Sequence, residues 1–176
     1  MTFVSVLSAL YANCRSLFSR PMGKFADKYS FAKMLTVCFV IKAAAFAVNT
    51  FTVPSNGYVF YTIYYMLTAI AMAGINSAVI NLIYDYVDQE RRMSALALNN
   101  TFGGFAGFFT TLAISPLVEF IQNNNNTFLG MHVYAQQVVS AISFVLVLFV
   151  LLYLHTVVAK LQNKRSKGKI EQMQES

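Results

Sequence analysis

The polar segment from residue 20 to residue 35, RPMGKFADKYSFAKML, contains the groups best suited to electrostatic chemistry. The Asp27 carboxylate can bind a nearby cation or the positive N-terminal end of a helix, and Gly23 allows a close approach of the chain. Such a contact can act as a latch, because the relative movement of two helices makes and breaks it. We therefore predict a short turn between two helices that serves as a gating loop. Its residues are Arg20, Gly23, Asp27 and Lys28.

Small and polar residues recur at helical spacing in three apolar segments, near residues 5, 77 and 104. Small residues let helices pack closely, and Gly103 and Gly107 form a GxxxG pair. Polar side chains within a membrane normally face protein or water, so the same stripes could instead line a wet cavity for a polar solute. Both interpretations stay open at this point. The candidate cavity residues are Ser5, Ser8, Ser77, Asn81, Asn100 and Thr111, and the candidate helix-packing residues are Gly74, Gly103, Gly104 and Gly107.

Lys42 is the ionisable residue placed deepest in an apolar segment, roughly 15 Å along its helix and near the middle of a bilayer. An intramembrane charge is a candidate functional group by default, although a lysine can also snorkel or bind a nearby polar group. Catalytic patterns are absent from the sequence: there is no nucleophile elbow, HExxH, GK[ST] loop or intramembrane carboxylate pair. We therefore expect no enzyme activity, no cofactor and no metal site.

The elements that carry these residues must be membrane helices. The chain has 176 residues, of which 57% are hydrophobic and only 11% are charged, and a positive mean hydropathy. A helix needs roughly 20 apolar residues to cross a bilayer. We predict an all-α, polytopic membrane helix bundle over residues 1–158, with a basic cytoplasmic tail at 159–176. The five predicted transmembrane helices cover residues 2–19, 32–52, 57–84, 94–121 and 132–158.

The cations fix the predicted orientation. Apart from Lys42, every Lys and Arg falls in residues 15–33, at Arg91 and Arg92, or in the tail, whereas the alternate loops near residues 51–57 and 122–128 carry none. The positive-inside rule therefore places the charged turns and the C-terminus in the cytoplasm. The net charge of +6 reports this topology, so we expect no nucleic-acid partner.

The spacing G-x-x-A-D-K resembles the signature loop of the major facilitator superfamily, commonly G-x-L-A-D-R-x-G-R-K. The matching residues are Gly23, Ala26, Asp27 and Lys28. Phe25 replaces the leucine, Ser30 replaces the second glycine, and the trailing cation pair is reduced to Lys33. This weakened form resembles the copy in the second half of the family. The resemblance implies a partial major facilitator fold that corresponds to helices eight to twelve of a twelve-helix transporter.

The resemblance also implies a function: secondary active transport of a small solute by alternating access, in the plasma membrane, or in the inner membrane of a bacterium. The expected partners are the lipid bilayer, a small-molecule substrate and the missing N-terminal half. We expect the stripes at residues 74–77 and 103–107 to be exposed and to drive association of the chain with itself or with that half. The alternative is a membrane-embedded interaction or assembly protein without transport activity, which would explain the small-residue stripes equally well.

Overall fold

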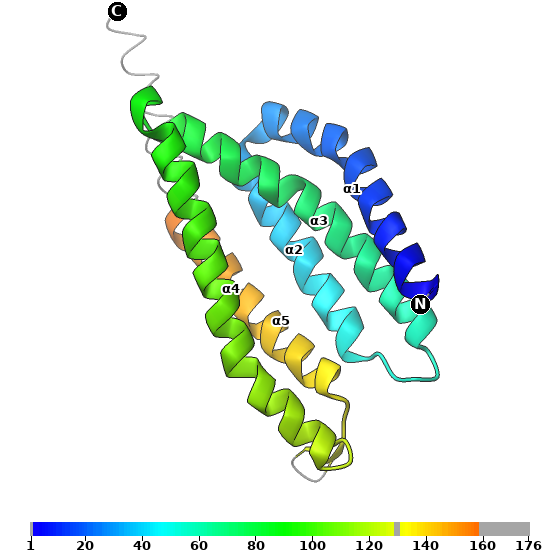
Figure 1. The fold of residues 1–176 in the computed structure, drawn as a ribbon. Coiled ribbons are helices and arrows are strands. Elements are labelled where there is room, and N and C mark those ends of the chain that lie inside the picture. Colours follow the sequence, from blue (N-terminus) through cyan, green and yellow to red (C-terminus); the bar gives the residue numbers. More distant parts are fainter. Residues whose placement is uncertain (1, 129–130, 159–176) are drawn as a thin grey trace, which may run out of the picture.

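The computed structural model describes residues 2–128 and 131–158, and it is a bundle of long helices (Figure 1). The predicted basic tail at 159–176 lies outside the described residues. The long helices are α1 (Thr2–Tyr29), α2 (Phe31–Thr50), α3 (Gly57–Tyr86), α4 (Arg92–Asn123) and α5 (Ala135–Tyr153). Shorter elements are the 3-10 helix η1 (Gln89–Arg91), the antiparallel strands β1 (Thr127–Phe128) and β2 (Met131–His132), and the π-helix η2 (Leu154–Val158). The predicted all-α bundle is confirmed, with one small hairpin added.

Four of these helical segments are long and apolar enough to cross a membrane. They are Phe31–Thr50, Gly57–Tyr86, Gln89–Asn123 and Ala135–Val157. The 28-residue helix α1 is not among them, since serines and the cations Arg15, Arg20 and Lys24 interrupt its apolar residues. The protein is thus an integral membrane protein whose first helix is less apolar than predicted.

The helices run up and down, so the connections gather at two ends of the bundle (Figure 1). We call the end with Ser30 and residues 87–91 the charged end, because most cations of the described chain lie there. The opposite end holds residues 51–56 and the hairpin. Helix α2 packs against α3 and α5, and α1 packs against α3. Helix α4 contacts α3 and α5 only sparsely, and Ile121 is its single buried residue.

The apolar core lies toward the charged end, where α1, α2, α3 and η2 meet. Its buried members are Ala26, Met34, Leu35, Cys38, Ala78 and Leu154. Met34 and Cys38 have no exposed surface, and Ala26 is only 3% exposed. Met22 and Phe25 pack against this cluster from α1. The second half of α1 is therefore held by apolar contacts, and those contacts position the predicted gating residues.

Polar side chains join three helices at the opposite end. The Asn49 Nδ2 group of α2 donates to Ser140 Oγ of α5 at 2.7 Å, and both residues are buried. The Thr52 hydroxyl donates to Asn49 Oδ1 at 3.3 Å. The Tyr61 hydroxyl of α3 donates to Gln136 Oε1 of α5 at 2.6 Å. Each buried polar group in this set has a partner, so the set stabilises the helix ends without an unpaired group.

Candidate functional site

The predicted gating loop is not a loop. Helix α1 continues through Pro21 and past Asp27 to Tyr29, so Gly23 and Asp27 are helical residues. The helix persists because Met22, Phe25 and Ala26 recur at helical spacing, with Ala26 buried in the core and Met22 and Phe25 packed against it. The prediction of a short turn over residues 20–35 was therefore wrong, since the connection between α1 and α2 is the single residue Ser30.

The four predicted gating residues lie on or beside the exposed surface of α1. Arg20, Asp27 and Lys28 are exposed, and a Cβ added at Gly23 would meet no atom within 4 Å. The close approach that we expected at Gly23 is thus absent from the described chain. Asp27 forms no hydrogen bond or ion pair with another described residue. Its carboxylate is free, within this part of the chain, to bind a group that the chain does not supply.

Ser30 makes the sharp connection, and its backbone explains the sequence motif. Its φ of 156° and ψ of 158° belong to a region that favours glycine. Ser30 also occupies the position of the second glycine in the motif. Its side chain accepts a hydrogen bond from the backbone N–H of Lys33 at 3.2 Å, which caps the start of α2. Compared with glycine, the serine is strained in this backbone conformation, but its hydroxyl caps α2.

The four candidate packing glycines fall into two environments. Gly74 of α3 is buried, and a Cβ there would collide with Cys38 Sγ of α2 and lie 3.6 Å from Met22 Sδ of α1. Gly103, Gly104 and Gly107 of α4 are open, with no atom within 4 Å of an added Cβ. Exposure of the stripe at residues 74–77 was therefore predicted wrongly at Gly74, because α1 and α2 cover it. The glycine stripe of α4 has no covering helix in the described chain.

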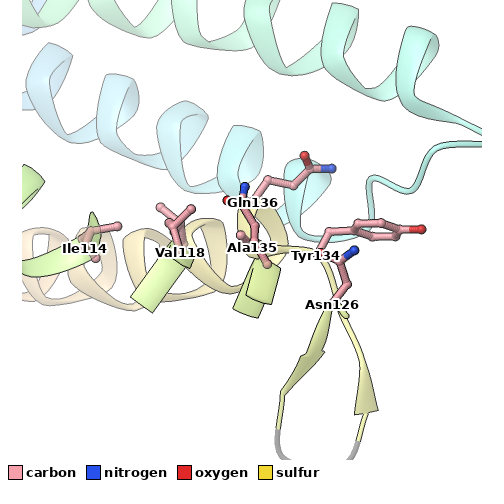
Figure 2. Close-up of a pocket in the computed structure, with 8 residues that line it drawn as sticks. Ile114, Val118, Asn126, Tyr134, Ala135 and Gln136 are labelled. Carbon is pink, nitrogen blue, oxygen red and sulfur yellow. The ribbon is translucent and has the colours of Figure 1, made fainter. Parts of the chain in front are cut away.

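A groove lies between α4 and the start of α5, at the opposite end of the bundle (Figure 2). Two adjoining hollows of about 400 and 460 Å³ share Ile114, Val118, Gln122 and Val139 and together form what we call the α4–α5 groove. Figure 2 shows Ile114 and Val118 along α4, with Tyr134, Ala135 and Gln136 where α5 begins. The remaining lining residues are polar: Thr110, Thr111, Ser115, Glu119 and Asn126.

The two walls of the groove, α5 and α4, differ in how many contacts they make with the rest of the described chain. On the α5 side, Gln136 is tied to Tyr61 and, through its Nε2 group, to the Thr52 carbonyl oxygen at 3.5 Å. Its side chain points from α5 toward α2 and α3, as Figure 2 shows. On the α4 side, Glu119 and Gln122 are exposed. A ligand in the groove would therefore meet an α5 that is packed against α2 and hydrogen-bonded to α3, and an α4 with few contacts to the rest of the described chain.

A comparison with protein families gives a match over almost the whole chain. The family model of the Major Facilitator Superfamily matches residues 1–174. The chain belongs to the Major Facilitator Superfamily. It is therefore a membrane transporter of the major facilitator type, and the members of this family are transporters and not enzymes. No curated protein and no solved structure gave a significant match.

The candidate cavity residues of this major facilitator protein differ in exposure. Ser5 and Ser8 are exposed on α1, and Asn100 and Thr111 are exposed on α4. Ser77 and Asn81 are half-buried on α3, where Asn81 Nδ2 donates to the Ser77 carbonyl oxygen at 2.8 Å. Thr111 lines the α4–α5 groove. A shared cavity for all six residues stays a prediction.

The structure places three groups in or beside the groove that the sequence analysis did not assign to a site: Glu119, Gln122 and Gln136. From the sequence, Glu119 near the outer end of its helix is expected to be solvated at the membrane interface. For two of them a signal was present, since residues 111, 115, 119 and 122 continue the polar stripe of α4 at helical spacing. Gln136 had no such signal, because its role depends on Tyr61, which is 75 residues away in sequence.

Lys42 lies between α2 and α3, away from the groove. Its Nζ atom is 3.5 Å from Thr68 Oγ1, 4.7 Å from the centre of the Phe46 ring and 5.8 Å from the centre of the Tyr64 ring. Aromatic faces attract a cation, so these rings and the hydroxyl supply a polar environment within the helix pair. The geometry supports the structural interpretation of Lys42 over a role in binding a solute.

Proposed function

We propose that the protein moves a small solute by secondary active transport with alternating access, and that its five helices correspond to helices eight to twelve of a twelve-helix transporter. Family membership over residues 1–174 supports the transporter class. The single observation that carries the finer proposal is the uncovered face of α4. In this family two helix bundles rock about a shared site, so a face for the second bundle must remain open within the first.

The open face combines two properties of a cavity wall, which are free space and exposed polar groups. Gly103, Gly104 and Gly107 leave space beside the helix, since an added Cβ at each would meet no atom within 4 Å. Asn100 and Thr111 are exposed at helical spacing beside them. Polar groups of this kind are costly against lipid tails and are normally covered by protein or water. We infer that the missing N-terminal half covers this face and leaves a wet pathway along Asn100 and Thr111, with Ser5, Ser8, Ser77 and Asn81 as further lining residues.

We assign Asp27, together with Arg20, Gly23 and Lys28, to a latch at the charged end. Asp27 is exposed and unpaired within the described chain, and the core contacts of Met22 and Ala26 hold its helix in place. A carboxylate on a rigid helix can bind the positive N-terminal end of a helix from the other half in one state and release it in the next. We place the charged end in the cytoplasm of a plasma-membrane protein, or of an inner-membrane protein in a bacterium.

The test is uptake into vesicles. The purified 176-residue chain should move no candidate solute above background, whereas co-expression with an N-terminal half should give uptake that depends on an ion gradient. The same glycine face supports a second candidate function, a membrane-embedded assembly protein that uses the face only for association. Association with the N-terminal half without uptake would favour that second function. Robust transport by the chain alone would refute the two-bundle proposal.

The latch has its own test in the paired halves. Asp27→Asn should slow turnover at least tenfold and leave substrate affinity within a few fold, because the residue lies at the bundle end and away from a midplane site. Asp88→Asn is the matched control, since Asp88 is also an exposed carboxylate at the charged end. A loss of affinity with unchanged turnover would show that Asp27 binds the solute instead.

A further inference from the structure

The α4–α5 groove differs from the predicted cavity in one chemical respect, which is that it carries a full charge. Glu119 lines it, and this carboxylate forms no ion pair or hydrogen bond with another described residue. Of the Lys and Arg residues in the described chain, all but Lys42 lie within residues 15–33 or at Arg91 and Arg92. The opposite end of the described bundle therefore has a carboxylate without a lysine or arginine near it.

The rest of the groove suits a ligand that is polar at one end and apolar along its body. Ile114, Val118 and Val139 form its apolar walls. Ser115 and Gln122 lie four residues before and three residues after Glu119 on the same helix, so their hydroxyl and amide oxygens are next to the carboxylate. Thr110 also lines the groove, about 13 Å further along α4. The Thr111 hydroxyl already donates to the Gly107 carbonyl oxygen at 2.9 Å, so its oxygen remains available as an acceptor. A carboxylate with acceptor oxygens beside it, at Ser115 and Gln122, favours a donor that carries a positive charge.

We propose that the α4–α5 groove binds a small organic cation, an ammonium group on an apolar body, with Glu119 as its counter-charge. The two hollows of about 400 and 460 Å³ lie within the range of small-molecule sites. This inference rests on the proposed function insofar as the bound cation is a class of solute for the transporter. The same ammonium chemistry also occurs in the ethanolamine headgroup of a lipid, so the experiment must separate a free solute from a headgroup.

The experiment measures equilibrium binding to the full chain, purified in a neutral maltoside detergent. Three probes of matched shape are compared: 2-phenylethylamine, which is cationic, 2-phenylethanol, which is neutral, and phenylacetate, which is anionic. We expect the amine to bind at least tenfold more tightly than the alcohol, and phenylacetate not to bind. Equal affinity for the amine and the alcohol would overturn the proposal, because the carboxylate would then contribute nothing.

Two variants locate the site. Glu119→Gln keeps the shape of the side chain and should weaken amine binding about tenfold or more, with alcohol binding unchanged. Glu90→Gln, at an exposed carboxylate of the charged end, is the matched control and should leave amine affinity unchanged. Val139→Trp should block both probes by filling the groove, whereas Leu152→Trp, on an exposed face of the same helix, should not. Unchanged amine binding in both Glu119→Gln and Val139→Trp would overturn the proposal.

A final arm distinguishes the source of the cation. Added phosphatidylethanolamine that displaces 2-phenylethylamine, when phosphatidylglycerol does not, assigns the groove to a lipid headgroup. If neither lipid displaces 2-phenylethylamine, the ligand of the groove is a free amine. Binding is measured without transport, so failure of uptake by the paired halves would refute the proposed function and leave this result intact. Absence of amine binding would remove the groove site and say nothing about the transport of a different solute.

Discussion

Gly74 on α3 and Gly104 on α4 lie in similar small-residue stripes, yet only Gly74 is enclosed by other helices. A side chain at Gly74 would meet Cys38 and Met22, whereas a Cβ at Gly104 would meet nothing within 4 Å. The first stripe allows α1, α2 and α3 to pack around a core, and the second faces outward from a helix with one buried residue. The same residue type thus completes one interface within the chain and leaves another open.

The largest expected effect on stability is at Gly74, the glycine that other helices cover. Gly74→Ala should lower the free energy of unfolding by about 3 kcal/mol, because the new methyl group overpacks the contact with Cys38 Sγ. The measurement is denaturant-induced unfolding in detergent. Cys38→Ala in the same chain should recover much of the loss by removing the sulfur. Additive effects of the two substitutions would contradict the predicted clash.

The next effect concerns the polar contacts between α2 and α5. Asn49→Leu should destabilise the bundle by about 2 kcal/mol, since it leaves the buried Ser140 hydroxyl without the bond that it accepts at 2.7 Å. Asn100→Leu is the control on α4, where the asparagine is exposed, and it should change stability by less than about 0.5 kcal/mol. Thermal unfolding of both variants checks the comparison. Equal losses would mean that α4 is packed more tightly than the structure shows.

Two substitutions at Ser30 should change the free energy of unfolding by smaller amounts and in opposite directions. Ser30→Gly should stabilise the chain by about 1 kcal/mol, because glycine adopts a φ of 156° without strain and a glycine cap costs only a few tenths of a kcal/mol. Ser30→Ala should destabilise it by about 1 kcal/mol, since the cap to Lys33 is lost and the strain remains. The same unfolding assay separates the two. A loss of stability in Ser30→Gly would show that the hydroxyl matters more than the backbone.

The smallest effect on stability is expected at Gly104. Gly104→Ala should alter the free energy of unfolding of the isolated chain by no more than about 0.5 kcal/mol, because its surroundings are open. Gly104→Leu should nonetheless weaken co-purification with an N-terminal half, since a large side chain would separate two close helices. Unchanged co-purification would show that this face contacts lipid alone.

Much of the fold was predictable because membrane helices follow from local composition. Runs of roughly 20 apolar residues must form helices in lipid, where each backbone polar group needs an internal partner. The points at which the helices begin and end were less predictable. Residues 20–29 look polar when read as a segment, but the spacing of Met22, Phe25 and Ala26 lets one face enter the core while Asp27 faces outward. The segment that we predicted as a turn is helical, because the apolar contacts of one face stabilise the helix more than its charged residues oppose it.

By itself, the sequence determined the membrane class, the helix count and the resemblance at Gly23, Ala26, Asp27 and Lys28, because these depend on residue type and short-range spacing. Only the tertiary structure decided which glycine is covered and which is open. It also decided that Gln136 and Tyr61 meet across 75 residues and that α4 and α5 form a groove around Glu119. Contacts of that kind depend on how separate helices pack, and spacing within one helix carries no information about its neighbour.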